Sequence, residues 1–136
     1  MINEFVFLDT SFFKAFVDAE DDFHSDAVRI LQNLEQTETT LITTNYILDE
    51  TVTLIRAKCG LPRVKNFREA LVKLSHFKIY RVFATDEEKA WDWFWNDWSK
   101  LSFTDCTSFA VMKRLGLIRV ATFDSHFSSA GFKIEK

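Results

Sequence analysis

The sequence predicts an α/β domain with three layers, α/β/α, around a central, mostly parallel sheet of four to five strands. Residues 5–8 are apolar at every position, as in a strand that is buried on both faces. Short apolar or alternating segments recur along the chain, and longer segments with helical periodicity separate them. Strands that alternate with helices in this way are typical of a parallel sheet covered on both faces.

The expected elements follow one another along the whole chain. We expect strands at residues 5–8, 40–43, 78–83, 118–123 and 132–134. We expect helices at residues 11–17, 24–34, 45–58, about 62–76, from Thr85 through Trp98, and 104–115. Gly60 and Gly116 are suited to end helices, and Pro62 is suited to begin one. Thr85 and Glu88 have the spacing of a capping box, and Thr104 is a candidate cap for the last helix.

Length and composition limit the possible classes of protein. The 136 residues predict one domain that covers residues 1–136. The net charge of −3 lacks the basic excess of a non-specific nucleic-acid binder, but it leaves room for an enzyme whose acidic site is masked by metal. Glu4 and Asp9 interrupt the first apolar run, so we expect no signal peptide, and no run approaches the roughly 18 apolar residues of a membrane span. Cys59 and Cys106 have no metal-binding spacing, and we expect a reduced, cytoplasmic protein.

Four acidic residues indicate a function. Asp9 and Asp124 follow expected strands, whereas Glu50 and Asp105 lie in the opening turns of expected helices. The carboxyl ends of parallel strands form one edge of the sheet, where ligands bind. Carboxylates that converge there repel one another, and one or two Mg²⁺ or Mn²⁺ ions relieve the repulsion. Ions bound in this way can activate water for attack on a phosphodiester.

Each of these acids also has a purely structural interpretation. Asp9 can be an N-cap, Asp105 a first-turn acid favoured by the helix dipole, and Asp124 an Asx-turn residue. Asp49 precedes Glu50, and the two side chains project about 100° apart on a helix, so only one of them can point into the cleft.

Four motifs occur in order along the chain. They are Phe7-Leu8-Asp9-Thr10-Ser11, Thr43-Thr44 with Ile47-Leu48-Asp49-Glu50-Thr51, Ser102-Phe103-Thr104-Asp105-Cys106, and Ala121-Thr122-Phe123-Asp124-Ser125-His126-Phe127. Together they resemble the PIN-domain ribonucleases, in particular the VapC toxins of toxin–antitoxin pairs. The resemblance implies that the catalytic and metal-binding acids are Asp9, Glu50, Asp105 and Asp124, with Glu50 chosen over Asp49. It further implies that Thr122 and Ser11 orient a carboxylate or water.

The same resemblance implies an endoribonuclease that depends on Mg²⁺ or Mn²⁺, a homodimer, an RNA substrate and a small antitoxin partner. Two alternatives remain open on the residues alone. One is a Mg²⁺-dependent phosphotransfer domain, receiver-like or phosphohydrolase-like, although Asp9-Thr10-Ser11 lacks the second acid of the usual phosphohydrolase motif. The other is a PIN-shaped binding module without catalytic activity.

Three further sets of residues carry weaker signals. Trp91, Phe94, Trp95 and Trp98 have the spacing of a buried helical stripe, and Trp93 lies off it, where an exposed Trp would indicate a dimer, antitoxin or RNA contact. The three histidines are interpreted as surface or turn residues, with His126 nearest the expected site. A basic set is interpreted as a solvated face or a rim that follows phosphates, and its members are Arg56, Lys58, Arg63, Lys65 and Arg68.

Overall fold

All strands of the sheet run parallel, in the order β3-β2-β1-β4-β5. β1 (Phe5–Leu8) lies at the centre, between β2 (Thr40–Thr44) and β4 (Arg119–Ala121). The outer strands are β3 (Phe77–Tyr80) and β5 (Lys133–Ile134). This computed structural model describes residues 4–136. The predicted parallel sheet is confirmed.

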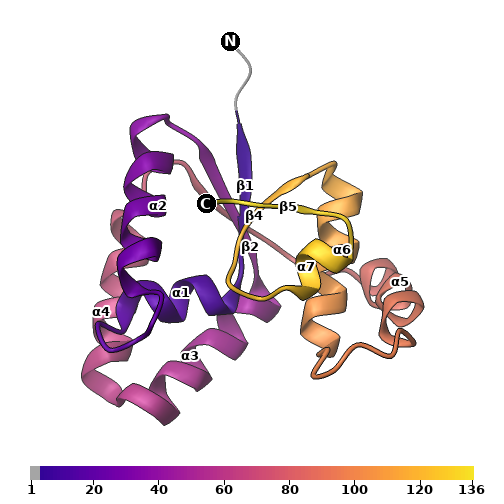
Figure 1. Ribbon diagram of the computed structural model, residues 1–136, viewed down its shortest axis with the longest axis horizontal. Helices are drawn as coiled ribbons and strands as arrows, with labels where there is room; N and C mark the ends of the chain where they lie inside the picture. The colour runs from indigo at the N-terminus through magenta and orange to yellow at the C-terminus, as the bar shows by residue number, and fades with distance from the viewer. Residues whose placement is uncertain (1–3) are drawn as a thin grey trace.

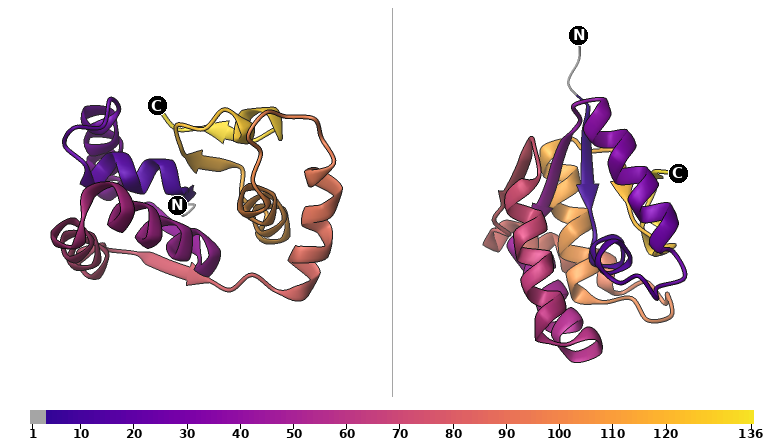
Figure 2. Two further views of the ribbon diagram at one scale, coloured as in Figure 1. Left: turned by 90° about the horizontal axis from the view of Figure 1, so that it is seen from below. Right: turned by 90° about the vertical axis from the view of Figure 1, so that its left-hand side faces the viewer.

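Helices cover both faces of the sheet, which completes the predicted three layers (Figures 1 and 2). One side holds α1 (Thr10–Val17), α2 (His24–Gln36), α3 (Asn45–Cys59) and α4 (Leu61–Lys73). The other side holds α5 (Ala84–Phe94), α6 (Phe103–Leu115) and the short α7 (His126–Ser129). The sequence pattern did not predict α7, which is only four residues long.

The core lies on both sides of β1. Phe7 is fully buried, as the apolar run of β1 requires for a central strand. On the side of α1, Phe13 packs edge-on against Phe67 of α4, with ring centroids 5.3 Å apart. On the opposite side, Phe109 of α6 packs edge-on against Phe127 of α7 at 5.0 Å. These aromatic pairs fix both helical layers against the same strand.

Two predicted helix starts are wrong in detail. α5 begins at Ala84, so Phe83 takes the N-cap position and Thr85 is not the cap. The Asp86 carboxylate accepts a hydrogen bond from the Phe83 N–H at 2.8 Å. α6 begins at Phe103 with Ser102 as its cap, in place of Thr104. Gly60 ends α3 and Gly116 ends α6, both with the positive φ that glycine tolerates best, as predicted.

The predicted aromatic stripe of α5 is correct only in part. Phe94 and Trp98 are half-buried and pack against the core, whereas Trp91 and Trp95 are 46% and 73% exposed. Trp93, which lies off the stripe, is half-buried and packs against Phe109 at 5.3 Å. The inward face of α5 is formed by Asp86, Ala90 and Trp93, and Asp86 is buried because Arg114 pairs with it.

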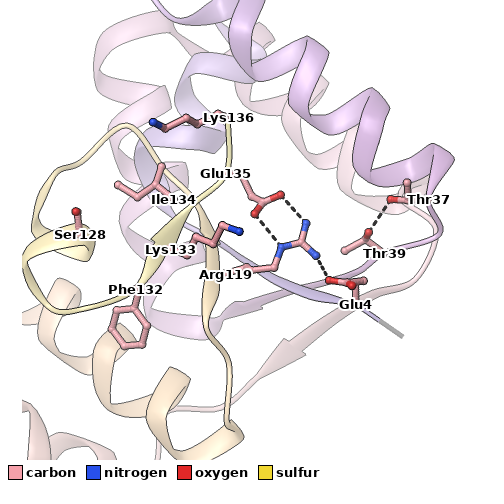
Figure 3. A pocket seen from close by; sticks show the side chains of 10 residues that line it. All are labelled: Glu4, Thr37, Thr39, Arg119, Ser128, Phe132, Lys133, Ile134, Glu135 and Lys136. Carbon is pink, nitrogen blue, oxygen red and sulfur yellow. Dashed lines mark hydrogen bonds and ion pairs between the residues drawn. The ribbon is translucent and has the colours of Figure 1, made fainter. Parts of the chain in front are cut away.

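At the amino ends of β1 and β4, Arg119 forms ion pairs with Glu4 and Glu135 beside a shallow hollow (Figure 3). This hollow lies at the edge of the sheet opposite to the predicted site. Within residues 4–136, no helix has the length and apolar character needed to cross a membrane.

Candidate active site

The sheet order brings the two ends of the chain together at the predicted edge. β1 and β4 are parallel neighbours, and Leu8 lies opposite Ala121 in their register. The Asp9 amide continues this pairing by donating to the Ala121 carbonyl at 3.2 Å. Asp9 and the segment from Thr122 to Asp124 therefore leave the sheet side by side.

Asp9 is held by hydroxyl groups from both strand ends. Its Oδ2 accepts hydrogen bonds from Thr122 Oγ1 at 2.8 Å and from Ser11 Oγ at 3.0 Å. The Ser11 amide also points at Oδ2 from 3.4 Å, so Asp9 is the N-cap of α1 as well. Ser11 Oγ accepts the Phe123 amide at 2.9 Å, which ties the start of α1 to the end of β4. Asp9 is 3% exposed, and these bonds fix the direction of its carboxylate.

Asp105 and Asp124 are oriented by backbone groups. Asp105 forms a capping box with Ser102: its Oδ2 accepts the Ser102 amide at 3.2 Å, and its own amide donates to Ser102 Oγ at 3.0 Å. Asp124 Oδ1 accepts the His126 amide at 2.9 Å, which is an Asx turn. Each structural interpretation of these acids is therefore correct as local geometry. Each carboxylate nevertheless retains one oxygen to which no hydrogen bond is made within residues 4–136.

The three aspartates influence one another electrostatically. Burial and, to a smaller extent, the charge of Asp124 raise the pKa of Asp9 to about 6. The hydrogen bonds from Thr122 and Ser11 favour the carboxylate and oppose this rise. Burial, followed by the charges of Asp9 and Asp124, raises the pKa of Asp105 to about 7. Raised pKa values of this kind suit the site to a cation, because bound positive charge favours the ionised carboxylates.

His126 joins this cluster, which corrects its interpretation as an ordinary surface or turn residue. Its side chain is only 15% exposed, and its Nδ1 lies 2.9 Å from Asp124 Oδ1 and 3.5 Å from Asp105 Oδ2. One ligand atom from each of these three residues fits within a group whose members are all less than 4.8 Å apart. The presence of His126 in the Asp124-Ser125-His126 motif was the only sequence signal for this arrangement.

Glu50 lies outside the tight group. It is half-buried on α3, and within residues 4–136 its carboxylate makes no hydrogen bond or ion pair. The next residue, Thr51, is fully buried and donates to Thr10 Oγ1 at 3.1 Å, which places this turn of α3 beside the residue that follows Asp9. Asp49 is exposed. The choice of Glu50 over Asp49 stays a prediction.

Comparison with known proteins identifies the family. The family model described as the PIN domain matches residues 6–133. The chain belongs to the PIN-domain family. It is 37% identical over 129 residues to the 23S rRNA-specific endonuclease VapC20 of Mycobacterium tuberculosis, covering 93% of this chain and 95% of that protein. It is 36% identical to a VapC ribonuclease of Archaeoglobus fulgidus, covering 89% of this chain and 78% of that protein.

Solved structures agree with this assignment. The crystal structure of M. tuberculosis VapC20, described as a Sarcin-Ricin loop cleaving toxin, matches with a TM-score of 0.79 and 37% identity, over 93% of this chain and 95% of that one. FitAcB from Neisseria gonorrhoeae shares the fold alone, with a TM-score of 0.68 at 16% identity over 96% of each chain. The predicted resemblance to PIN-domain ribonucleases of the VapC type is confirmed, and a phosphotransfer domain is not favoured.

Proposed function

We propose that this PIN-domain protein is a divalent-metal-dependent endoribonuclease and the toxin of a toxin–antitoxin pair. The observation that carries the proposal is the convergence of Asp9, Asp105 and Asp124 at one edge of the sheet. That convergence occurs in a chain whose 37% identity to a 23S rRNA-specific endonuclease extends over nearly its whole length.

The donor set fits a divalent cation. Carboxylate oxygens suit Mg²⁺ and Mn²⁺, and the three aspartates are held by caps and turns that fix the direction of their carboxylates. A bound Mg²⁺ or Mn²⁺ supplies positive charge that polarises a scissile phosphodiester and lowers the pKa of an attacking water. Asp9, Asp105 and Asp124 would hold it, with Glu50 as a further acid of the site.

Thr122 and Ser11 act through Asp9. Both hydroxyls lie at hydrogen-bond distance from the same oxygen, Asp9 Oδ2, and they lie 3.0 Å from each other. Thr122 Oγ1 also accepts the Asp124 amide at 3.0 Å. These contacts keep the two aspartates in a fixed relation, so that the site is formed before the ion and the RNA arrive.

The charge distribution supports RNA as the substrate. Residues 51–83, which we call the basic segment, contain eight Lys and Arg residues and a single acid, Glu69, in a chain of net charge −3. Within residues 4–136, none of the eight forms an ion pair, and all but Arg63 are exposed. Exposed cations that form no ion pair are suited to bind phosphates, and the segment begins on α3, the helix that carries Glu50.

The partners follow from the same assignment. We expect a small antitoxin that covers the site, a homodimer, and a cytoplasmic location where RNA is accessible. The exposed Trp91 and Trp95 stack on each other at 5.4 Å, and Trp91 lies 4.9 Å from Phe103, near the Asp105 cap. Exposed aromatic groups of this size are common at protein interfaces.

The test is RNA cleavage by the purified protein with Mg²⁺ or Mn²⁺, using ribosomal RNA and a DNA of the same sequence. Asp9→Asn and Asp105→Asn should each lower cleavage by about 100-fold or more, since each removes a charge that holds the cation. Asp92→Asn, on an exposed position of α5, is the matched control and should cleave like the unmodified protein. Full activity of either site variant would refute the assignment.

A further inference from the structure

The His126 imidazole is fixed in one tautomer by its surroundings. Its Nε2 lies 2.8 Å from the Ser99 carbonyl oxygen, and because a carbonyl only accepts, Nε2 must carry a proton. In the neutral ring, Nδ1 then presents a bare lone pair. This atom is the single buried side-chain N or O atom in residues 4–136 that lacks a hydrogen-bond partner.

The Nδ1 lone pair faces carboxylate oxygens of two aspartates. Asp124 Oδ1 is 2.9 Å away and Asp105 Oδ2 is 3.5 Å away, and each oxygen is itself occupied by a backbone amide. The short approach to Asp124 lacks the direction of a hydrogen bond. With the neutral ring, these three acceptors repel one another, and either a proton on Nδ1 or a bound cation removes the repulsion.

The separations match those of ligands around one ion. Adjacent ligands of an octahedral ion at about 2.1 Å are themselves about 3 Å apart. The distances from Nδ1 to the two carboxylate oxygens lie close to this value. The opposite ring nitrogen is bound to a backbone carbonyl, as is usual for a histidine that ligates metal.

The connection between α5 and α6 holds the ring in place. The Trp98 ring lies nearly parallel to the His126 ring, at 9° and with centroids 6.3 Å apart, and the next residue supplies the Ser99 carbonyl. The backbone of His126 is fixed by its amide bond to Asp124. The imidazole is therefore positioned from two sides before an ion binds.

We propose that His126 Nδ1 is a direct ligand of the catalytic cation, alongside Asp105 and Asp124, so that the site has a mixed nitrogen and oxygen donor set. The inference rests on the proposed function only in taking these acids as the metal site. Imidazole favours transition ions over Mg²⁺, which prefers oxygen ligands. The protein should therefore discriminate in favour of Mn²⁺ more strongly than an all-carboxylate site would.

The decisive measurement is pulsed electron paramagnetic resonance of the full chain loaded with Mn²⁺, without RNA. The unmodified protein should show modulation from a directly bound ¹⁴N, and ¹⁵N-histidine labelling should replace it with the ¹⁵N pattern. Because labelling changes no side chain, this part does not depend on the folding of a variant. Mn²⁺ bound with no histidine nitrogen coupling would overturn the inference and leave a nuclease with an all-oxygen site.

A variant assigns the coupling to one residue. His126→Phe keeps a ring to stack on Trp98 and removes the nitrogen, so the coupling should disappear and calorimetry should show Mn²⁺ affinity reduced about tenfold or more, with a smaller change for Mg²⁺. His76→Asn is the control, because His76 is an exposed residue with φ 52°, a conformation that asparagine tolerates. Persistence of the coupling in His126→Phe, or its loss in His76→Asn, would contradict the proposal.

Discussion

Thr122 Oγ1 donates a 2.8 Å hydrogen bond to Asp9 Oδ2 and so joins the end of β4 to the end of β1, between residues 113 positions apart in sequence. The same hydroxyl accepts the Asp124 amide, so one side chain connects two acids of the candidate site. The relation explains why a hydroxyl residue is placed two positions before Asp124.

Replacing Thr122 with valine should test this connection, because valine keeps the shape and removes the hydroxyl. We expect the free energy of unfolding to fall by about 1–2 kcal/mol, since a buried acceptor and a buried amide each lose a partner. Mn²⁺ affinity should also fall as Asp9 loses its orientation. Chemical denaturation and calorimetry measure the two effects. Thr122→Ser, which retains the hydroxyl, should lie closer to the unmodified protein, and equal losses in both variants would contradict the connection.

Stability without metal should decrease as pH rises. Asp9 and Asp105 have folded-state pKa values of about 6 and about 7, above the ordinary 3.8, so the folded protein holds protons that the unfolded chain releases. The stabilisation is complete below about pH 4 and is lost as pH rises through 6 and 7. For Asp9 alone, the resulting fall in the free energy of unfolding is on the order of 3 kcal/mol.

Thermal unfolding with a chelator present, measured from pH 5 to pH 8, checks this dependence. The Asp9→Asn variant should show a shallower decline, because one of the groups with a raised pKa is gone. Addition of Mn²⁺ at pH 8 should restore stability to the unmodified protein. A metal-free stability that rises over this range would show that other groups dominate the titration.

The pair Asp49 and Glu50 offers a matched comparison on one turn of α3. Glu50→Gln should reduce RNA cleavage by about 100-fold if this half-buried side chain contributes to the site. Asp49→Asn, at the exposed neighbouring position, should leave cleavage within about twofold. Initial rates at saturating Mg²⁺ and Mn²⁺ measure both. The opposite ranking would assign the fourth acid to Asp49.

The basic segment should contribute through charge. Lys65→Ser combined with Arg68→Ser, both exposed on α4, should weaken RNA binding and reduce the slope of log Kd against log salt by about 1.4, at roughly 0.7 for each lost phosphate contact. Binding is measured in the Asp105→Asn background to prevent cleavage. Lys133→Ser with Lys136→Ser removes the same charge elsewhere, and an equal effect from that pair would indicate a response to net charge alone.

Much of the site could be predicted because the direction of the parallel strands determines which edge of the sheet the acidic residues reach. Once Phe5–Leu8 is a buried parallel strand beside β4, Asp9 and Asp124 must share one edge of the sheet. The role of His126 in the site could not be predicted from sequence patterns. The position of its ring depends on the four-residue α7 and on the connection between α5 and α6 that supplies the Ser99 carbonyl. Neither segment has a periodicity that a pattern can detect.

The aromatic stripe is incomplete for a different reason. A spacing of i, i+3, i+4 and i+7 defines one face only where the helix continues, and α5 ends at Phe94, before Trp95. The exposed Trp91 stacks on Trp95 and lies against Phe103, outside the core. The buried face of α5 begins with Asp86. Because this residue is charged, a search for apolar periodicity does not assign it to the core. Its ion pair with Arg114 of α6 makes its burial possible, and that partner is remote in sequence.

The closure of β1 by β4 also has a consequence for biosynthesis. A nascent chain that has reached residue 118 possesses β1, with Asp9 at its end, but neither the adjoining strand nor the three residues Thr122, Asp124 and His126. The ribosome must therefore make almost the entire domain before Asp9 acquires the partners that come from the end of β4. Nuclease activity that depends on this arrangement is postponed until translation of the domain is nearly complete.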